Sequence, residues 1–244
     1  MNKNDTVTEQ PKINNKEYKV AEIIEESPDV KLYKFRALDN TKLDFDPGMF
    51  VMIKYKDQTQ EIARAFSIAS EPNSETLDFY IHLINGRFTS KIALARVGDI
   101  YYITGPYGQF KFIPGENKKL MFIAGGTGIA PFISMLRYII TRKLDVDVIL
   151  FYSVRFSNEI IARSELQEME KLVNLKTIIT VTREDTSWNG EHGRITKEMI
   201  EKYMPECNER MTYICGPLEF AKAMKNISIS CNIPSEKISA DIWG

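Results

Sequence analysis

The second half of the sequence repeats a pattern of strand, turn and helix. KLMFIAGG leads into TGIAPFISMLRYIITRK, and DVDVILFYSV leads into SNEIIARSELQEMEKLV. The same pattern returns at MTYICG and PLEFAKAMKNISIS, and ISADIW has the composition of a last strand. Strands that alternate with helices form parallel sheets with right-handed crossovers. Residues 117–244 are therefore predicted to form a doubly wound α/β domain.

The first half has a different pattern, with short runs rich in branched and aromatic residues that follow one another directly. Turn signals such as SPD, DPG and EPNSE separate them, and residues 88–97 have the pattern of a short helix. Six such runs with one helix predict a closed antiparallel β-barrel over residues 17–116. IPGENKK is expected to link the halves, and the polar residues 1–16 are expected to form a flexible tail.

Composition excludes several classes of function. Lys plus Arg (32) balance Asp plus Glu (33), so the broad cationic surface of a nucleic-acid-binding protein is not expected. Cys207, Cys215 and Cys231 match no metal-ligand or iron-sulfur spacing, so no metal is expected, and an odd, small number favours a reducing cytoplasm. The uncharged run 120–136 is shorter than the roughly 20 residues of a membrane span, and glycines and a proline interrupt it.

The turn AGGTGIAP, residues 124–131, comes where a doubly wound sheet binds its ligand. Glycines allow close backbone approach, and a helix N-terminus favours a phosphate group. The turn has neither the GK[ST] ending of a triphosphate-binding loop nor the spacing of GxGxxG. By itself it indicates a nucleotide site only weakly.

Five motifs in order make a more specific pattern: RAFSIAS, NGRFTS, GPYGQF, AGGTGIAP and YICGP. Their order and spacing over residues 17–244 resemble the ferredoxin-NADP reductase family, and bacterial-type ferredoxin or flavodoxin reductases are most similar. The resemblance implies a flavin-binding barrel followed by a domain that binds a nicotinamide nucleotide. The single motifs are common, and the specificity lies in their combination.

The resemblance assigns RAFSIAS to the flavin-binding strand. Arg64 would pair with the flavin phosphate, Phe66 would pack on the ring and ribityl chain, and Ser67 would lie near N5 of the flavin, where the hydride arrives. The family usually has Tyr where this chain has Phe66, which removes one hydroxyl. Strict strand alternation would also turn Ser67 away from the face that carries Arg64.

NGRFTS would form the second flavin anchor, through Gly86, Thr89 and the first N–H groups of a helix. An ordinary helix cap, with Thr89 or Ser90 as the N-cap residue, is the alternative, and both interpretations can hold together. Near the chain end, the resemblance implies that Trp243 stacks on the flavin and moves aside for nicotinamide. A last core residue is the alternative for Trp243.

For the nicotinamide nucleotide, the resemblance implies a pyrophosphate cradle and a nearby nicotinamide site. Thr127 would lie near the nicotinamide ring, and Cys215 in CGP would lie near the hydride-carrying carbon without acting as a reactive thiolate. The glycines of the cradle would be Gly125, Gly126 and Gly128, and Gly216 would also bind the cofactor. Basic side chains recognise the 2'-phosphate of NADPH well, and the family's candidate positions are Arg155, Thr182, Arg183 and Arg194. NADPH is therefore predicted over NADH.

The predicted function is that of an oxidoreductase which passes a hydride from NADPH to N5 of FAD and then single electrons to ferredoxin or flavodoxin. FMN is a less favoured flavin. Alternatives within the family are the reductase component of an oxygenase and a free-flavin or ferric reductase. An electron-transfer subunit that does not oxidise NADPH, and a nucleotide-binding module without redox activity, are alternatives of other classes.

Overall fold

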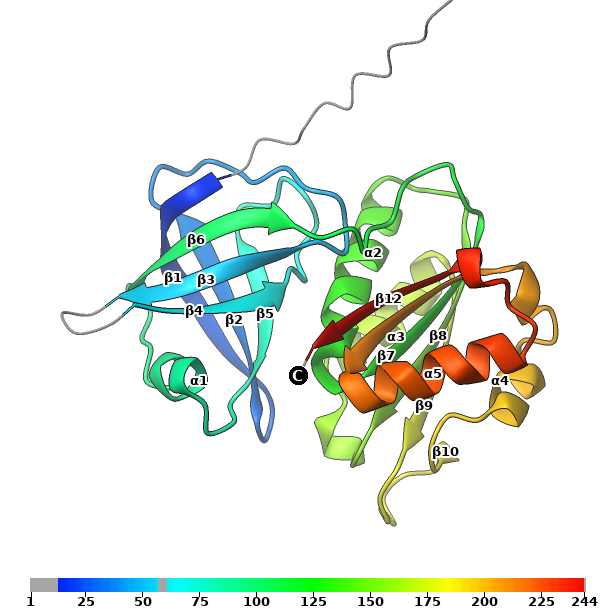
Figure 1. Ribbon diagram of the computed structural model, residues 1–244. Helices are drawn as coiled ribbons and strands as arrows, with labels where there is room; N and C mark the ends of the chain where they lie inside the picture. The colour runs from blue at the N-terminus through cyan, green and yellow to red at the C-terminus, as the bar shows by residue number, and fades with distance from the viewer. Residues whose placement is uncertain (1–12, 57–60, 244) are drawn as a thin grey trace, which may run out of the picture.

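The computed structural model describes residues 13–56 and 61–243, with the backbone alone for Lys56 and Trp243. Two six-stranded sheets lie side by side, one formed by the first half of the chain and one by the second (Figure 1). The two-domain fold class predicted from the sequence is thus confirmed.

The first sheet is antiparallel and curved, with strand order β4-β3-β6-β1-β2-β5. Its ends meet where the Ala69 N–H donates to the Asp78 carbonyl over 2.8 Å. The strands are β1 (Ile13–Ser27), β2 (Val30–Ala37), β3 (Phe50–Lys56), β4 (Glu61–Ser67), β5 (Leu77–His82) and β6 (Ile100–Tyr107), with helix α1 (Arg87–Ile92) between β5 and β6.

Two boundaries in this half differ from the prediction. Strand β1 begins at Ile13 and pairs with β6, so residues 13–16 belong to the sheet, while residues 1–12 of the expected tail lie outside the described part. Helix α1 ends at Ile92 and not at Val97. A turn replaces its last residues, because the Asp99 carboxylate accepts the Arg96 N–H over 2.8 Å.

The second sheet is parallel, with strand order β10-β9-β8-β7-β11-β12. Its strands are β7 (Lys119–Gly125), β8 (Asp147–Val154), β9 (Asn174–Val181), β10 (Glu191–His192), β11 (Met211–Pro217) and β12 (Ile238–Trp243). The helices are α2 (Ala130–Thr141), α3 (Arg163–Leu172), α4 (Lys197–Tyr203) and α5 (Leu218–Ser230), with short 3₁₀ turns η1 (Gly126–Ile129), η2 (Ser157–Glu159), η3 (Cys207–Glu209) and η4 (Ser235–Lys237). The sequence did not predict the two-residue strand β10.

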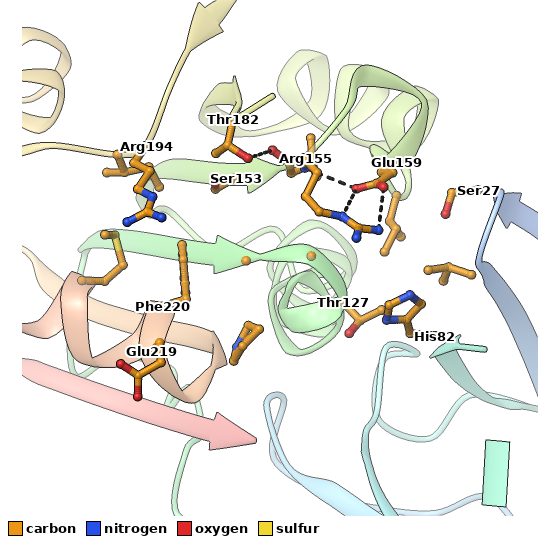
Figure 2. A pocket seen from close by; sticks show the side chains of 18 of the residues that line it. Ser27, His82, Thr127, Ser153, Arg155, Glu159, Thr182, Arg194, Glu219 and Phe220 are labelled. Carbon is orange, nitrogen blue, oxygen red and sulfur yellow. Dashed lines mark hydrogen bonds and ion pairs between the residues drawn. The ribbon is translucent and has the colours of Figure 1, made fainter. Parts of the chain in front are cut away.

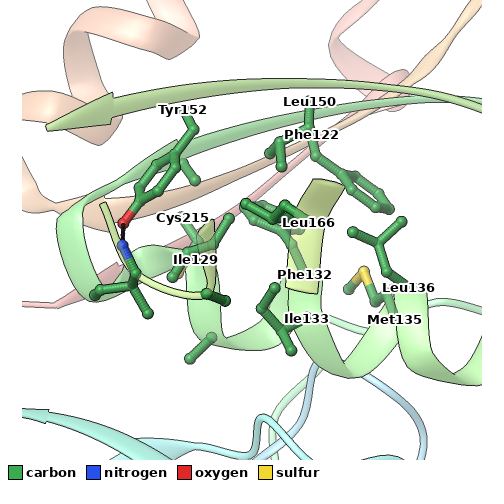
Figure 3. Packing of buried hydrophobic residues seen from close by; sticks show 14 of the residues in the cluster. Phe122, Ile129, Phe132, Ile133, Met135, Leu136, Leu150, Tyr152, Leu166 and Cys215 are labelled. Carbon is green, nitrogen blue, oxygen red and sulfur yellow. Dashed lines mark hydrogen bonds between the residues drawn. The ribbon is translucent and has the colours of Figure 1, made fainter. Parts of the chain in front are cut away.

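Helices cover both faces of the parallel sheet. Along β7, Leu120 and Phe122 face α2 and α3, whereas Met121 and Ile123 face α4 and α5. Figure 3 shows Phe122 beside Phe132 and Leu136 of α2. The chain winds from β7 to one side and returns to the other at β11, so the topological switch point lies between β7 and β11. Ligands of such sheets bind at this point, beyond the carboxyl ends of the strands.

The two halves share one hydrophobic core. Val30, Leu32, Tyr80, Phe110 and Phe112 from the first half belong to the same buried cluster as the inner side chains of α2. The halves are therefore packed as neighbours and not joined by a linker alone. No helix in the described part of the chain combines the length and apolar character needed to cross a membrane.

Candidate functional site

A pocket of about 510 Å³ opens at the carboxyl ends of β7, β8 and β11, at the topological switch point (Figure 2). The parallel-sheet half contributes most of its wall. The barrel half contributes Ser27, Asp29 and Val30 from the β1–β2 hairpin and His82 from the end of β5. Residues of both halves of the chain thus line the pocket.

The glycine turn after β7 forms one wall of the pocket. Its glycines are needed for different structural reasons. A Cβ on Gly128 would overlap the backbone carbonyl of Cys215, and a Cβ on Gly125 would lie 2.9 Å from the Phe220 ring. Gly216 is confined in the same way, since its Cβ would lie 2.6 Å from that ring. These three glycines allow the β7 turn to pack against β11 and α5.

Gly126 differs from the other glycines of the turn. It lines the pocket, has φ of +56°, and a Cβ there would meet no atom within 4 Å. The open backbone at Gly126 is followed by the start of η1 and then α2, where main-chain N–H groups lack helical acceptors. This open backbone, predicted as the pyrophosphate cradle, favours a bound anion.

Figure 2 draws Thr127 and His82 next to each other at the barrel end of the pocket. Strand β5 and turn η1 are in contact, which brings the two side chains to a common wall. His82 was not predicted as a site residue, because a lone histidine in a strand has no motif around it. Its only sequence signal is its place on the same strand face as Asp78 and Tyr80.

In Figure 2, Arg194 lies toward the other end of the pocket, whereas the Arg155 side chain points to Glu159. Arg194 lines it, and so do Arg155 and Thr182. The Arg155 guanidinium is held by the Glu159 carboxylate, with Nη2 at 2.8 Å and Nε at 3.2 Å, and this hydrogen bonding raises the pKa of Arg155. The Thr182 hydroxyl donates to the Val154 carbonyl over 3.1 Å. Arg155 therefore already has an anionic partner.

Arg183 does not line this pocket, although it follows Thr182 directly. Its backbone N–H donates to the Arg155 carbonyl over 3.0 Å, and its side chain is exposed. The pocket wall also carries three carboxylates, from Asp29, Glu159 and Glu219. The wall is therefore mixed in charge.

The predicted flavin strand, β4, lies outside this pocket. Arg64 is exposed and makes no ion pair with the residues that the structure describes. Phe66, which shares its strand face, is half-buried, with its ring centre 5.4 Å from that of Phe88 in α1 and 6.5 Å from that of Phe79. The cationic Arg64 thus lies on the strand that packs against α1.

The Gly86–Thr89 segment forms a helix cap. Gly86 is the N-cap residue of α1, so neither Thr89 nor Ser90 has that role. The Thr89 hydroxyl accepts the Gly86 N–H over 3.1 Å and donates to the Ile84 carbonyl, and the side chain is buried. Thr89 therefore shapes the loop around the helix start, and its hydroxyl already has two backbone partners.

Strand β12 brings the chain end back to the boundary between the halves (Figure 1). It pairs with β11 in a parallel register that places Cys215 opposite Asp241 and Pro217 opposite Trp243 along the backbone. Cys215 is fully buried, with its sulfur 4.0 Å from an Asp241 carboxylate oxygen. Burial raises the pKa of Asp241. The side chain of Trp243 lies outside the described residues, so its predicted stacking stays a prediction.

The structure thus gathers part of the predicted nucleotide set at one pocket and leaves the rest elsewhere. Those that line it are Gly125, Gly126, Thr127, Arg155, Thr182 and Arg194. Those that do not are Gly128, Arg183, Cys215 and Gly216, and the predicted flavin residues Arg64, Phe66, Ser67, Gly86 and Thr89. Ser67 ends β4 beside Phe50 of β3 and is half-buried. No group of three or more metal-ligating side chains is placed to hold a metal ion among the described residues.

Two family models match consecutive parts of the chain. The oxidoreductase FAD-binding domain matches residues 17–112, and the oxidoreductase NAD-binding domain matches residues 122–226. The first range coincides with the barrel and the second begins within β7. The division into two sheets is thus also a division into two recognised domains.

Curated relatives are similar over most of this chain. The reductase subunit of glycine betaine monooxygenase from Chromohalobacter salexigens is 29% identical over 213 residues, which are 84% of this chain and 58% of the relative. The plasma membrane-associated coenzyme Q6 reductase PGA3 of Saccharomyces cerevisiae is 31% identical over 81% of this chain and 68% of its own. This chain therefore corresponds to little more than half of the monooxygenase reductase subunit.

Among solved structures, the ferredoxin reductase in carbazole 1,9a-dioxygenase has a TM-score of 0.83 and 28% identity. The match covers 96% of this chain and 70% of that one. The cytochrome b5 reductase domain of Ulva prolifera nitrate reductase has a TM-score of 0.82 at 24% identity, which shows the shared fold.

Proposed function

Because this chain belongs to the ferredoxin reductase-type family of FAD-binding and NAD-binding oxidoreductases, we propose that it takes a hydride from a reduced nicotinamide nucleotide and passes electrons singly to a carrier protein. The observation that carries this proposal is the pocket at the switch point, closed by the glycine turn on one side and by the barrel on the other. A nucleotide bound there would lie between the domains that the family models assign to NAD and FAD.

In this proposal each end of the site has a task. Gly126 and the start of α2 would bind the pyrophosphate through main-chain N–H groups, and Thr127 and His82 would orient the nicotinamide end. FAD would be held by Arg64, Phe66, Ser67, Gly86, Thr89 and Trp243, and FMN remains the less favoured flavin. When bound, the flavin supplies the conversion of a two-electron hydride into single electrons.

The preference for NADPH remains part of the proposal. Arg194 supports it, because it lines the pocket and a guanidinium binds a phosphate dianion well. Arg155 supports it less, since Glu159 already holds its guanidinium. Replacing Arg194 with Met should raise the NADPH Kd about tenfold, the equivalent of about 1.4 kcal/mol, and leave the NADH Kd within about twofold. Equal loss for both nucleotides would remove NADPH preference from the proposal.

The one-electron step is tested by stoichiometry. The FAD-loaded protein is mixed with NADPH or NADH and with one electron acceptor: ferredoxin, flavodoxin or ferricyanide. The reduction of each acceptor is followed by its change in absorbance. One nucleotide oxidised for each pair of acceptor molecules reduced is the expected result. Oxidation of the nucleotide without reduction of any one-electron acceptor would contradict the proposal.

A second candidate is the reductase component of an oxygenase. Two similar proteins support it, because they are named as the reductase subunit of glycine betaine monooxygenase and the ferredoxin reductase in carbazole 1,9a-dioxygenase. Three cysteines are fewer than the four that usually hold an iron-sulfur cluster, so another protein or segment would carry the electrons onward. Faster reduction of an iron-sulfur oxygenase partner than of flavodoxin would favour this candidate.

The location remains a proposal as well. Cys207, Cys215 and Cys231 are buried and form no disulfide with one another, a state that fits a reducing cytoplasm. Fractionation of cells that produce the protein tests this assignment, with recovery in the cytoplasmic fraction expected and recovery with membranes contradicting it.

A further inference from the structure

Helix α2 touches the barrel at the point where the predicted flavin strand ends. Ser134 and Arg137 lie three residues apart on α2 and so share a helix face. The Ser134 hydroxyl donates to the Ser70 carbonyl over 2.7 Å, and Arg137 Nη1 donates to the Ala69 carbonyl over 3.0 Å. Both acceptors belong to the segment that directly follows β4 and Ser67.

Arg137 is also fixed by two carboxylates from different halves of the chain. Its Nη1 lies 3.0 Å from Asp78 Oδ2 on β5, and its Nε and Nη2 lie 2.7 Å and 3.0 Å from the two oxygens of Glu165 on α3. The Asp78 side chain is 9% exposed and that of Arg137 is 22% exposed. A planar guanidinium can make these bonds together, whereas a lysine ammonium cannot reproduce the fork.

The same helix carries the nucleotide cradle at its other end. Helix α2 begins at Ala130, directly after η1 and its pocket residues Gly126 and Thr127. At 1.5 Å per residue, Arg137 lies only about 10 Å along the helix from Ala130. Phe132, Ile133, Met135 and Leu136 are fully buried, so the helix is held firmly in the shared core (Figure 3).

We propose that Arg137 and Ser134 are positioning residues for hydride transfer, which act by fixing the segment after Ser67 to the helix that carries the nucleotide cradle. They would set the distance between the two cofactor sites without touching either cofactor. This inference rests on the proposed function. A buried ion pair is by itself weak evidence that its residues serve stability. A positioning role fits instead, because hydride transfer is sensitive to small displacements of the reacting groups.

A matched control exists in the same domain. Arg210 is 5% exposed and binds the Leu120 and Asp147 carbonyls at 3.1 Å and 3.0 Å, and it also pairs with the Asp147 carboxylate. These partners lie at the amino-terminal ends of β7 and β8, whereas the pocket lies at the carboxyl ends of the strands. Arg210→Met therefore breaks a comparable buried network, and the side-chain partners of Arg210 all belong to the parallel-sheet domain.

The test compares Arg137→Met, Arg137→Lys and Ser134→Ala with Arg210→Met. Three quantities are measured: the limiting rate of anaerobic flavin reduction at saturating nucleotide, the nucleotide Kd, and amide hydrogen exchange of residues 68–71 in the flavin-free protein. Arg137→Met should lower the limiting rate about tenfold or more, since a misplacement of about 1 Å can cost about a hundredfold. Its nucleotide Kd should change less than about threefold, about 0.65 kcal/mol.

Exchange at residues 68–71 should be faster in Arg137→Met and unchanged in Arg210→Met. Arg137→Lys should recover only part of the rate, and Ser134→Ala should show a smaller loss in the same direction. Arg210→Met should lower Tm and keep the limiting rate within about twofold of the original protein, because the pocket geometry is untouched.

An unchanged limiting rate in a folded Arg137→Met protein would overturn the inference, as would an equal loss in Arg210→Met. If Arg137→Met does not fold, an unchanged rate and exchange pattern in Ser134→Ala would overturn it. The failure of the proposed function has a different signature, since then neither NADPH nor NADH would reduce the flavin of the unsubstituted protein.

Discussion

At the scale of single residues, the glycines of the turn after β7 have different surroundings. Gly126 lies at the pocket together with Gly125 and Thr127, and a Cβ on it would meet no atom within 4 Å. Gly128 is confined by the backbone of Cys215, which lies far along the chain. The two glycines should therefore respond differently to substitution.

Two alanine substitutions should separate packing from binding. Gly128→Ala forces a methyl group into the Cys215 backbone and should cost about 1–3 kcal/mol of stability. Gly126→Ala should cost about 1–2 kcal/mol for its left-handed conformation, with the added methyl group in the pocket. Only Gly126→Ala should also weaken NAD(P)H binding by about tenfold. Urea denaturation measures the stability, and nucleotide titration measures the binding. Unchanged nucleotide binding by Gly126→Ala would contradict the proposed binding of the pyrophosphate at Gly126.

Asp241 gives a prediction about pH. Burial raises the pKa of its carboxyl in the folded protein, so the folded state keeps this proton to a higher pH than the unfolded chain does. Stability from this group is therefore present below the ordinary pKa of 3.8 and is lost as pH rises through the raised value. Asp241→Asn should be more stable than the original protein at about pH 7 and equal to it at about pH 3.

Urea denaturation midpoints at these two pH values measure the effect. Cys215→Ser is a useful comparison, since it alters the neighbouring group and leaves the carboxyl in place. A lower midpoint for Asp241→Asn at neutral pH would show that the ionised carboxylate makes a stabilising contact and would contradict the prediction.

At the scale of elements, periodicity predicted most of the strands and helices correctly. The long strands β7 and β8 have buried side chains on both faces, and α2 and α5 follow glycine or proline turns. Periodicity did not predict the end of α1 correctly, because a side-chain hydrogen bond sets that boundary. The Asp99 carboxylate accepts the Arg96 N–H there. Periodicity also missed β10, which is too short to have a period.

The cap of α1 gives the prediction at this scale. Thr89→Val keeps the side-chain shape and removes both hydroxyl hydrogen bonds, so the Gly86 N–H and the Ile84 carbonyl keep only the bond that they make with each other. The loss should be about 1–2 kcal/mol of stability, with weaker FAD binding because the loop at the helix start loosens. Ser90→Ala, at the exposed neighbouring position, should change neither quantity.

Thermal denaturation of the flavin-free protein and FAD titration provide the measurements for Thr89→Val. If Tm falls while FAD affinity stays the same, the α1 start is a structural cap without a role in flavin binding.

At the scale of the whole molecule, the division into two domains could be predicted and their junction could not. The change from consecutive strands to alternating strands and helices marks the division in the sequence. The junction depends on Asp78, Tyr80 and His82, which share one face of β5, and on Arg137, which meets that face from α2. Such a match between distant segments has no local sequence signal.

The shared core predicts cooperative unfolding of both halves. Phe110, Phe112 and Tyr80 are packed in the same cluster as α2, so separating the halves would expose large apolar side chains. Calorimetry of the flavin-free chain should therefore show a single transition, with a van't Hoff enthalpy equal to the calorimetric enthalpy. Two resolved transitions would mean that the barrel and the parallel-sheet domain unfold independently.

The proposed function requires a nicotinamide nucleotide and a flavin on either side of the domain boundary. Its most direct test is anaerobic rapid mixing of the FAD-loaded protein with NADPH or NADH, unlabelled or deuterated at the transferred hydrogen. We expect loss of flavin absorbance in a phase that is slower with the deuterated nucleotide. No loss of absorbance with either nucleotide would contradict this placement of the two cofactors.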